Sequence, residues 1–319
     1  MTVPANTTQS TAMRVREDLS RIIELTSPLD TPFSNMAGKD TTDNRTPEWA
    51  TESIRASDHD NAAVEGDDVT ADAQTQPTIV KNHVQTFDET IAVSDIAQLV
   101  NTVKGKKELA RQVALAGYAL RLDIEKRACG NYPSVAATSS VAGKFAGAQA
   151  WLTSNTNRGA GAGANGGYNS GTGIVAAATN GTARALTSAL FKATIQTGWT
   201  NGRGTLDWVL CGAAQKVNIS ALTGIVQATN EVSKDKVAIL AAVDVYKSDF
   251  GFHSIMASRE YDARSVLFAT KRTWKITTLE PYNIKKLAKT GHNEKALLCR
   301  TVTLKCLDEK QNAILADLT

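Results

Sequence analysis

The sequence has little aromatic content and few cysteines. Phe, Trp and Tyr make up 6% of the 319 residues, and the four cysteines lie far apart, with no CxxC pair among them. A disulfide-stapled miniprotein and a cysteine-based zinc site are therefore excluded, and we expect reduced, buried thiols.

Long apolar runs are missing as well. Val113–Leu120 and Val237–Val243 are among the longest, and both fall short of the roughly 18 residues that a membrane span requires. The opening residues contain neither the basic nor the apolar region of a secretory signal. We therefore expect no membrane partner and a soluble protein made in a cytoplasm.

Motifs for catalysis or cofactor binding are also absent. The four histidines show neither HxxxH nor HExxH spacing, and no Walker A, dinucleotide or calcium-loop motif occurs. Gly167–Gly171 is no G-x-S-x-G elbow, because it has one residue too many before its serine. We predict no catalytic residue, cofactor or metal, and we interpret the glycine-rich stretch 158–173 as a flexible surface loop.

What the sequence does have is a strong separation of charge. The apolar fraction of 42% and the charged fraction of 21% are ordinary for a globular protein, and the net charge is only +3. Residues 1–100, however, carry 17 acidic and 7 basic side chains, and residues 101–319 carry 15 acidic and 28 basic ones. The extreme is an acidic run: Asp58, Asp60, Glu65, Asp67, Asp68 and Asp72.

Three interpretations of this division stay open from composition alone. A solvated acidic loop beside a mildly basic domain would produce it. So would a protein in which the acidic front half of one copy lies on the basic back half of another. Nucleic acid is a third partner for the basic part, although its lysines are dispersed rather than clustered with aromatic residues, which disfavours a sequence-reading module.

The first third of the chain predicts few regular elements. Residues 14–25 have the spacing of a short amphipathic helix, and the prolines that follow favour extended chain over residues 26–50. Alternating residues near 46–54 and 78–84 predict two strands that pair around the acidic run. An isolated hairpin of this kind is marginal in water, so we expect it to bury a face on another chain.

Helical periodicity is clearest in the next segment. Ser94 and Asp95 are candidate N-caps for a helix over residues 96–103. A long helix is predicted from after Gly105 to about Arg127, followed by a glycine stop. Its apolar stripe is Leu109, Val113, Ala116, Leu120 and Ile124.

The remainder alternates between helix and strand. Helices are predicted at residues 185–197 and 213–222, and buried or alternating strands at the other apolar segments. These strands cover residues 206–211, 237–246, 253–258, 274–279, 297–306 and 313–316. The sequence therefore predicts a mixed α+β protein.

Six segments in order resemble the major capsid proteins of tailed bacteriophages, which have the HK-97-type shell fold. The first is Arg16–Phe33, which matches that family's opening helix followed by S-P-x-x-T-P-F. The others are Glu48–Thr51 with Val64–Asp68, Lys107–Asn131, Val245–Gly251, Leu279–Tyr282 with Leu287–Lys295, and Ala313–Leu318. Together they span nearly the whole chain.

The resemblance implies a subunit divided into an N-terminal arm, an extended hairpin loop, a peripheral domain built on a long spine helix, and an axial domain. The expected boundaries are 1–50 for the arm, 51–88 for the loop, 89–144 with 265–319 for the peripheral domain, and 145–264 for the axial domain. The loop would lie over a neighbouring copy, with the six acidic residues as inter-subunit contacts.

Function and partners follow from the same resemblance. Identical copies would form pentamers and hexamers of an icosahedral phage head that encloses double-stranded DNA, so the protein would be located in the virion after assembly in the host bacterial cytoplasm. Portal protein and a separate scaffold or cement protein are the other expected partners. Contact with DNA would be non-specific and salt-dependent.

Two alternatives and one departure accompany this interpretation. A nanocompartment (encapsulin-like) shell protein shares the fold, and a cytoplasmic α/β enzyme using residues 185–260 is the candidate from another class. Some relatives cross-link a loop lysine to an asparagine of the next subunit. Lys81 is the only lysine in this hairpin and no matching partner motif occurs, so that chemistry is not expected here.

Overall fold

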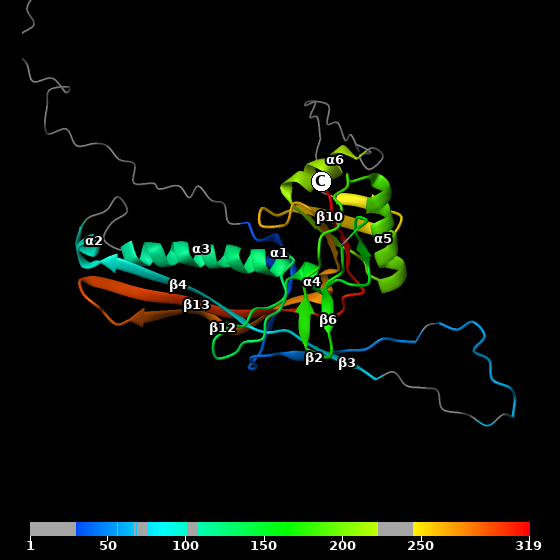
Figure 1. Ribbon diagram of the computed structural model, residues 1–319, viewed down its shortest axis with the longest axis horizontal. Helices are drawn as coiled ribbons and strands as arrows, with labels where there is room; N and C mark the ends of the chain where they lie inside the picture. The colour runs from blue at the N-terminus through cyan, green and yellow to red at the C-terminus, as the bar shows by residue number, and fades with distance from the viewer. Residues whose placement is uncertain are drawn as a thin grey trace, which may run out of the picture.

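The computed structural model describes residues 30–319 apart from 56, 67, 69–75, 101–107, 162 and 223–244. The helix predicted over residues 14–25, and most of the strand predicted over 237–246, lie outside the described residues. Within them, an elongated platform meets a more compact unit at one end, and a long hairpin loop projects from the junction (Figure 1). No described helix has both the length and the apolar composition needed to cross a lipid bilayer.

The platform is a four-stranded sheet in the order β1-β12-β13-β4. Its strands are β1 (Gly38–Thr41), β12 (Trp274–Leu287), β13 (Asn293–Cys306) and β4 (Gln85–Ser94). β12 and β13 form a long antiparallel hairpin, β4 pairs antiparallel with β13, and β1 pairs parallel with β12. β4 was not predicted from the sequence, although Phe87, Ile91 and Val93 alternate along it and are all buried.

One long helix lies along this sheet, beside β4 and β13 (Figure 1). It is α3 (Glu108–Cys129), and it confirms the predicted spine helix. Ala116, Leu120 and Ile124 of the predicted stripe are buried, and Leu109 and Val113 pack against the same core. The shorter α2 (Asp95–Leu99) begins at Ser94, whose side chain accepts a hydrogen bond from the Ala97 amide, as the N-cap prediction requires.

The compact unit contains a six-stranded sheet in the order β5-β14-β11-β8-β10-β9. Its strands are β5 (Thr156–Asn157), β14 (Ala313–Leu315), β11 (Val266–Ala269), β8 (Trp208–Cys211), β10 (Gly251–Ala257) and β9 (Val245–Ser248). The helices of this unit are α5 (Ser188–Gly202) and α6 (Ala213–Ala221). The closing segment 265–319 contributes strands to both sheets. β11, which pairs antiparallel with β8, and β14 belong to the six-stranded sheet, whereas β12 and β13 belong to the platform.

Part of the glycine-rich stretch, otherwise coil and turn in its described residues, forms a strand that was not predicted. β6 (Gly167–Asn169) pairs antiparallel with β7 (Ile174–Ala176). A side chain at Gly166 would lie 2.5 Å from the Ala176 carbonyl oxygen, so glycine is needed there for a close approach of two backbones. Tyr168 stacks on Trp151 with 5.9 Å between ring centroids. The absence of a side chain at Gly166 therefore permits tight packing at this point.

Two hydrophobic cores hold these units together. The larger lies between the platform sheet, α3 and the buried turn α4 (Ala148–Trp151), and includes Phe145 and Trp274. The smaller lies between the six-stranded sheet, α5 and α6, and includes Phe191 and Phe268. All four cysteines are buried and free, as predicted.

Candidate inter-subunit surfaces

The predicted hairpin is present, and its base is fixed to the subunit. β2 (Glu48–Thr51) pairs antiparallel with β3 (Thr78–Lys81). Trp49 donates from Nε1 to the Cys306 carbonyl oxygen over 2.9 Å, and its ring lies 5.6 Å from that of Trp151. Indole burial with a satisfied N–H ties the base of the hairpin to the platform.

Asn82 is the polar anchor at this base and is fully buried. Its Nδ2 donates to the Leu304 carbonyl oxygen over 2.8 Å, and its Oδ1 accepts from the amides of Ala146 and His83, both at 3.0 Å. The amide side chain thus joins the end of the hairpin, β13 and the segment before α4. This contact was not predicted, because its partners lie far apart in the sequence.

We expect Asn82→Ala to lower the free energy of unfolding by about 2–3 kcal/mol, because it leaves buried backbone groups without hydrogen-bond partners. Urea unfolding followed by circular dichroism measures the loss. Asn44→Ala, at an exposed position, serves as the control and should change stability by less than about 0.5 kcal/mol. Equal stability of the two variants would contradict the anchoring role.

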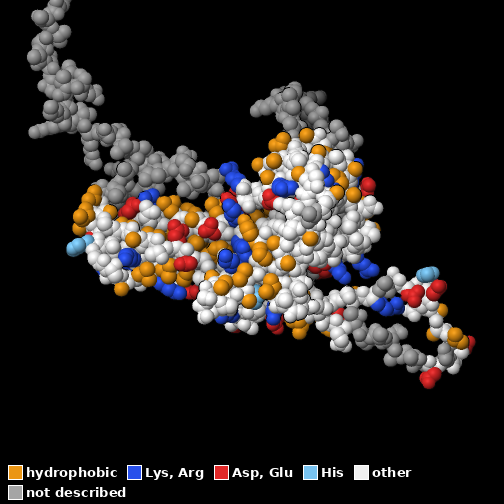
Figure 2. All heavy atoms as spheres, in the orientation of Figure 1, with side chains coloured by type: hydrophobic (Ala, Val, Ile, Leu, Met, Phe, Trp, Pro, Cys, Tyr) orange, Lys and Arg blue, Asp and Glu red, His pale blue; other side chains and the backbone are white. Residues whose placement is uncertain are grey.

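Beyond this base the loop is exposed. Asp58, Asp60, Glu65 and Asp68 are all exposed, and the loop stands clear of the body (Figures 1 and 2). Asp67 and Asp72 of the predicted contact set lie outside the described residues. The backbone amide of Asp60 donates to Asp58 Oδ1 over 3.0 Å, a contact within the loop itself.

The loop also carries exposed apolar side chains. Ile54 is 90% exposed and Val64 is 75% exposed. Large apolar side chains also gather at the far end of the platform, on and near α2, where Ile96 is 71% and Leu99 75% exposed (Figure 2). Adjacent exposed apolar side chains mark contact surfaces. The α2 patch was not predicted from the sequence, since its apolar residues were interpreted only as part of a helix.

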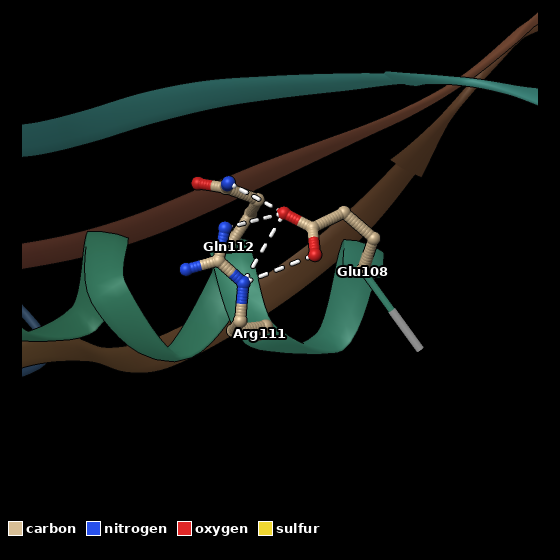
Figure 3. Close-up of polar contacts among 3 residues, drawn as sticks. All are labelled: Glu108, Arg111 and Gln112. Atoms are coloured by element: carbon tan, nitrogen blue, oxygen red, sulfur yellow. Dashed lines mark hydrogen bonds and ion pairs between the residues drawn. The ribbon is translucent and has the colours of Figure 1, made fainter. Parts of the chain in front are cut away.

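Several basic side chains of the second half pair with carboxylates of the same chain. At the start of α3, Arg111 donates to both carboxylate oxygens of Glu108, and Gln112 Nε2 donates to Glu108 Oε1 over 2.8 Å (Figure 3). Hydrogen bonds from Arg111 lower the pKa of Glu108. Lys289 and Lys305 are paired in the same way, at 3.0 Å from Asp95 and 2.8 Å from Asp40.

A buried carboxylate fixes the start of the described chain to the spine helix. Glu125 of α3 is fully buried and lies at the N-terminus of α1 (Pro32–Met36). Its two oxygens accept from the amides of Phe33, at 2.7 Å, and Ser34, at 2.8 Å, and also from the Ser34 hydroxyl. The carboxylate thereby satisfies amides that the first turn of a helix leaves unpaired.

We expect Glu125→Ala to cost about 2–4 kcal/mol of stability, since it strands these amides in the core. Burial raises the pKa of Glu125 above its ordinary value of 4.5, against the hydrogen bonds from Ser34 and Phe33. The part of the stability that depends on the titration of Glu125 is therefore fully present below pH 4.5 and is lost as the pH rises through the raised pKa.

Urea unfolding of wild type and Glu125→Gln between pH 4 and 7 tests this sign, because Gln keeps the shape of the side chain but does not titrate. The stability advantage of wild type over Glu125→Gln should shrink as the pH rises. A stability advantage of wild type that grows with pH would show that the hydrogen bonds lower the pKa of Glu125 by more than burial raises it.

The four cysteine thiols are buried. Burial raises the pKa of the Cys211 thiol to about 11 and those of Cys129 and Cys306 well above their usual range. The residues that the structure describes hold no group of three His, Cys, Asp or Glu side chains able to bind a metal.

Among the residues that the structure describes, Ser248 and His253 form an arrangement similar to a catalytic pair. Ser248 Oγ lies 2.7 Å from His253 Nε2, and His253 Nδ1 lies 2.7 Å from the Leu206 carbonyl oxygen. A carbonyl oxygen only accepts, so Nδ1 carries the proton. His253 is fully buried, and Ser248 Oγ accepts the Phe250 amide in the turn between β9 and β10. The pair therefore braces a turn, and it gives the alternative of an α/β enzyme no support.

Comparisons with solved structures match the whole fold. The chain superimposes on the capsid of a native GTA particle with a TM-score of 0.64 and 11% sequence identity, over 98% of each chain. It matches the capsid of cyanophage A-1(L) with a TM-score of 0.61 and 13% identity, over 98% of this chain and 99% of that one. The predicted α+β fold of the HK-97 type is confirmed.

Sequence comparisons agree with this fold. The major capsid protein of Escherichia phage Phieco32 is 33% identical over 105 residues, which are 33% of this chain and only 30% of that protein's length. The family model of the SU10 major capsid protein matches residues 3–319. The resemblance stated from six sequence segments is thereby confirmed, and the chain belongs to the SU10 major capsid protein family.

Proposed function

We propose that copies of this chain assemble into the shell of a phage head, as pentamers and hexamers of an icosahedral capsid around double-stranded DNA. Family membership and the capsid fold support this function. The observation that carries it is the hairpin, which is fixed at Trp49 and Asn82 but leaves its tip exposed away from the body. A two-stranded hairpin with an exposed tip is marginal in water, so a second copy supplies the missing contact.

The division of the subunit is part of the proposal. Residues 1–50 form the arm and 51–88 the extended loop. The peripheral domain consists of 89–144 with the platform strands β12 and β13, whereas the axial domain consists of 145–264 together with β11 and β14. The sequence-based division placed all of residues 265–319 in the peripheral domain. The proposed division instead assigns β11 and β14 to the axial domain, because they pair in the six-stranded sheet.

Head-to-tail contact explains why closed rings would form. The loop of one copy and the body of the next are different surfaces, so each copy both gives and receives the same contact, and a rotation that closes produces a ring. An exposed ion pair contributes roughly 0–1 kcal/mol. Because such pairs are repeated around each ring, their summed contribution to assembly is significant and favours a single register between neighbouring subunits.

The remaining partners follow the same proposal. Portal protein and a separate scaffold or cement protein join the shell, and the finished subunit is a component of the virion that assembled in the host cytoplasm. Contact with DNA is non-specific, through dispersed Lys and Arg side chains, and weakens at high salt because the release of counterions on binding is then less favourable.

Expression of the chain alone and with its neighbouring genes, followed by light scattering and negative-stain microscopy, tests this function. Particles tens of nanometres across, or rings of five or six subunits, are the expected products. Particles filled with protein cargo rather than nucleic acid would indicate a nanocompartment instead. A persistent monomer under all conditions would contradict assembly altogether.

A further inference from the structure

A basic groove lies where α1, β1, α3 and β12 meet. Its volume is about 760 Å³, and its lining includes Lys39, Arg121 and Arg300 together with hydroxyl groups of Thr278 and Tyr282. Basic side chains gather near α1 on the face shown in Figure 2. The function proposed above assigns no role to this groove, and the sequence did not reveal it because its three cations come from separate elements.

The cations of the groove have no carboxylate partner among the described residues. The Arg300 guanidinium lies 4.6 Å from the centroid of the Tyr282 ring, and its two NH groups donate to Tyr282 Oη at 3.3 Å and Thr278 Oγ1 at 3.5 Å. These neutral contacts hold the guanidinium in place without compensating its charge. Lys39 and Arg121 are exposed.

One carboxylate lines the groove, but its charge is already compensated. Asp40 accepts from Lys305 Nζ at 2.8 Å and from the Thr41 amide at 2.9 Å. The hydrogen bond from Lys305 lowers the pKa of Asp40, which keeps the pair ionised. The groove therefore presents three uncompensated cations and neutral hydroxyl groups, and its chemistry suits an acidic segment of chain.

We propose that this groove receives residues 57–66 of a second copy of the chain, with Asp58, Asp60 and Glu65 facing Lys39, Arg121 and Arg300. The inference rests on the proposed shell function and names the surface that receives the loop. Three acidic side chains occur within these ten residues and neither Lys nor Arg, and the one histidine, His59, lies 3.5 Å from Asp60.

The position of the loop supports a partner in another copy. The loop projects away from its own body (Figure 1). Residues 52–58 alone span up to roughly 24 Å when extended, so the acidic segment reaches well past the end of β2. Groove and loop are distinct surfaces of one chain, as head-to-tail contact requires.

A charge swap tests the pairing. The loop-reversed variant carries Asp58→Lys, Asp60→Lys and Glu65→Lys, and the groove-reversed variant carries Lys39→Glu, Arg121→Glu and Arg300→Glu. Light scattering measures the subunit concentration at half-assembly. We expect each variant to raise this concentration at least tenfold, and the variant with both sets of changes to return to within about threefold of wild type.

Two further variants test whether local unfolding of the groove or a change in net charge alone could weaken assembly. Lys39→Glu/Arg121→Glu leaves the contact between Arg300 and Tyr282 intact and should still raise the half-assembly concentration several-fold, with an unchanged circular dichroism spectrum. Lys192→Glu/Lys310→Glu changes exposed lysines outside the groove and should stay within about twofold of wild type.

The outcomes separate the groove from the function. If wild type assembles and the groove-reversed variant assembles equally well, the groove assignment is overturned while the shell function stands. If wild type never assembles, both fail. A third outcome has three parts: groove reversal blocks assembly, the variant with both sets of changes does not restore it, and groove reversal lowers the affinity for a 30-base-pair DNA duplex. In that case the groove binds phosphate, and the assignment of the loop to the groove is wrong.

Discussion

Reversing the charge of the loop is expected to abolish shell formation without unfolding the subunit. Asp58→Lys/Asp60→Lys/Glu65→Lys makes the loop basic. The loop of one copy would then repel the basic surface of the neighbour that it contacts. The three residues are exposed and contact no core residue, so folding should be unaffected. We expect an unchanged melting temperature and only unassembled subunits at concentrations where wild type forms particles, measured by calorimetry and light scattering.

A charge-matched control distinguishes the loop from net charge. Asp43→Lys/Asp123→Lys/Asp249→Lys makes the same change in net charge at exposed positions outside the loop and should leave assembly within about twofold of wild type. Assembly of wild type should also weaken between 0.1 and 0.5 M salt, since exposed charges are screened. Normal shells from the loop-reversed variant would show that the acidic loop makes no inter-subunit contact.

The second large effect concerns the spine helix. Leu120 is 2% exposed and lies in the larger core beneath α3. Leu120→Asp removes apolar contacts and places a carboxylate in this hydrophobic core, and each change is costly by itself. We expect a loss of more than about 4 kcal/mol in the free energy of unfolding, enough to leave little folded subunit.

The neighbouring residue provides the matched control. Ala119 lies on the exposed side of the same turn, and Ala119→Asp should cost less than about 1 kcal/mol, mainly through helix propensity. Urea unfolding of both variants, followed by circular dichroism, compares them directly. Similar stabilities would mean that the apolar stripe of α3 does not face the core as the structure places it.

The hairpin divides into an anchored base and an exposed tip, and this division matters for function. Asn82 and Trp49 fix where the hairpin leaves the subunit, so the acidic tip emerges in a defined direction. Ordering the base in advance lowers the entropy that must be lost when a second copy binds. Asn82→Ala should therefore weaken assembly as well as stability, whereas loop reversal should weaken assembly alone.

Local patterns predicted the elements that local physics determines. The stripe from Leu109 to Ile124 predicted α3, and the structure ends this helix at Cys129, close to the predicted end. Alternation on either side of the acidic run predicted β2 and β3 and their pairing. The acidic residues of the loop were predicted to be inter-subunit contacts. Those described are exposed, and their contact with another copy stays a prediction.

Long-range contacts were out of reach of the sequence. β4 pairs with β13 across some two hundred residues, from Gln85 with Val302 to Ser94 with Asn293, and nothing in a single sequence specifies that register. The short strand β6 within the glycine-rich stretch was not predicted, because composition does not reveal that Gly166 lies against the Ala176 backbone. Glu125 and Asn82 were missed since their hydrogen-bond partners are distant in the chain.

The sequence by itself determined the spine helix, the acidic loop and the separation of charge, because helical periodicity and charge are properties of neighbouring residues. Six short segments were also enough to indicate the capsid family. Only the tertiary structure decided which strands share a sheet, which buried polar groups hold the hairpin, and that Lys39, Arg121 and Arg300 line one groove. Such contacts depend on how distant segments pack, and packing is a property of the folded chain as a whole.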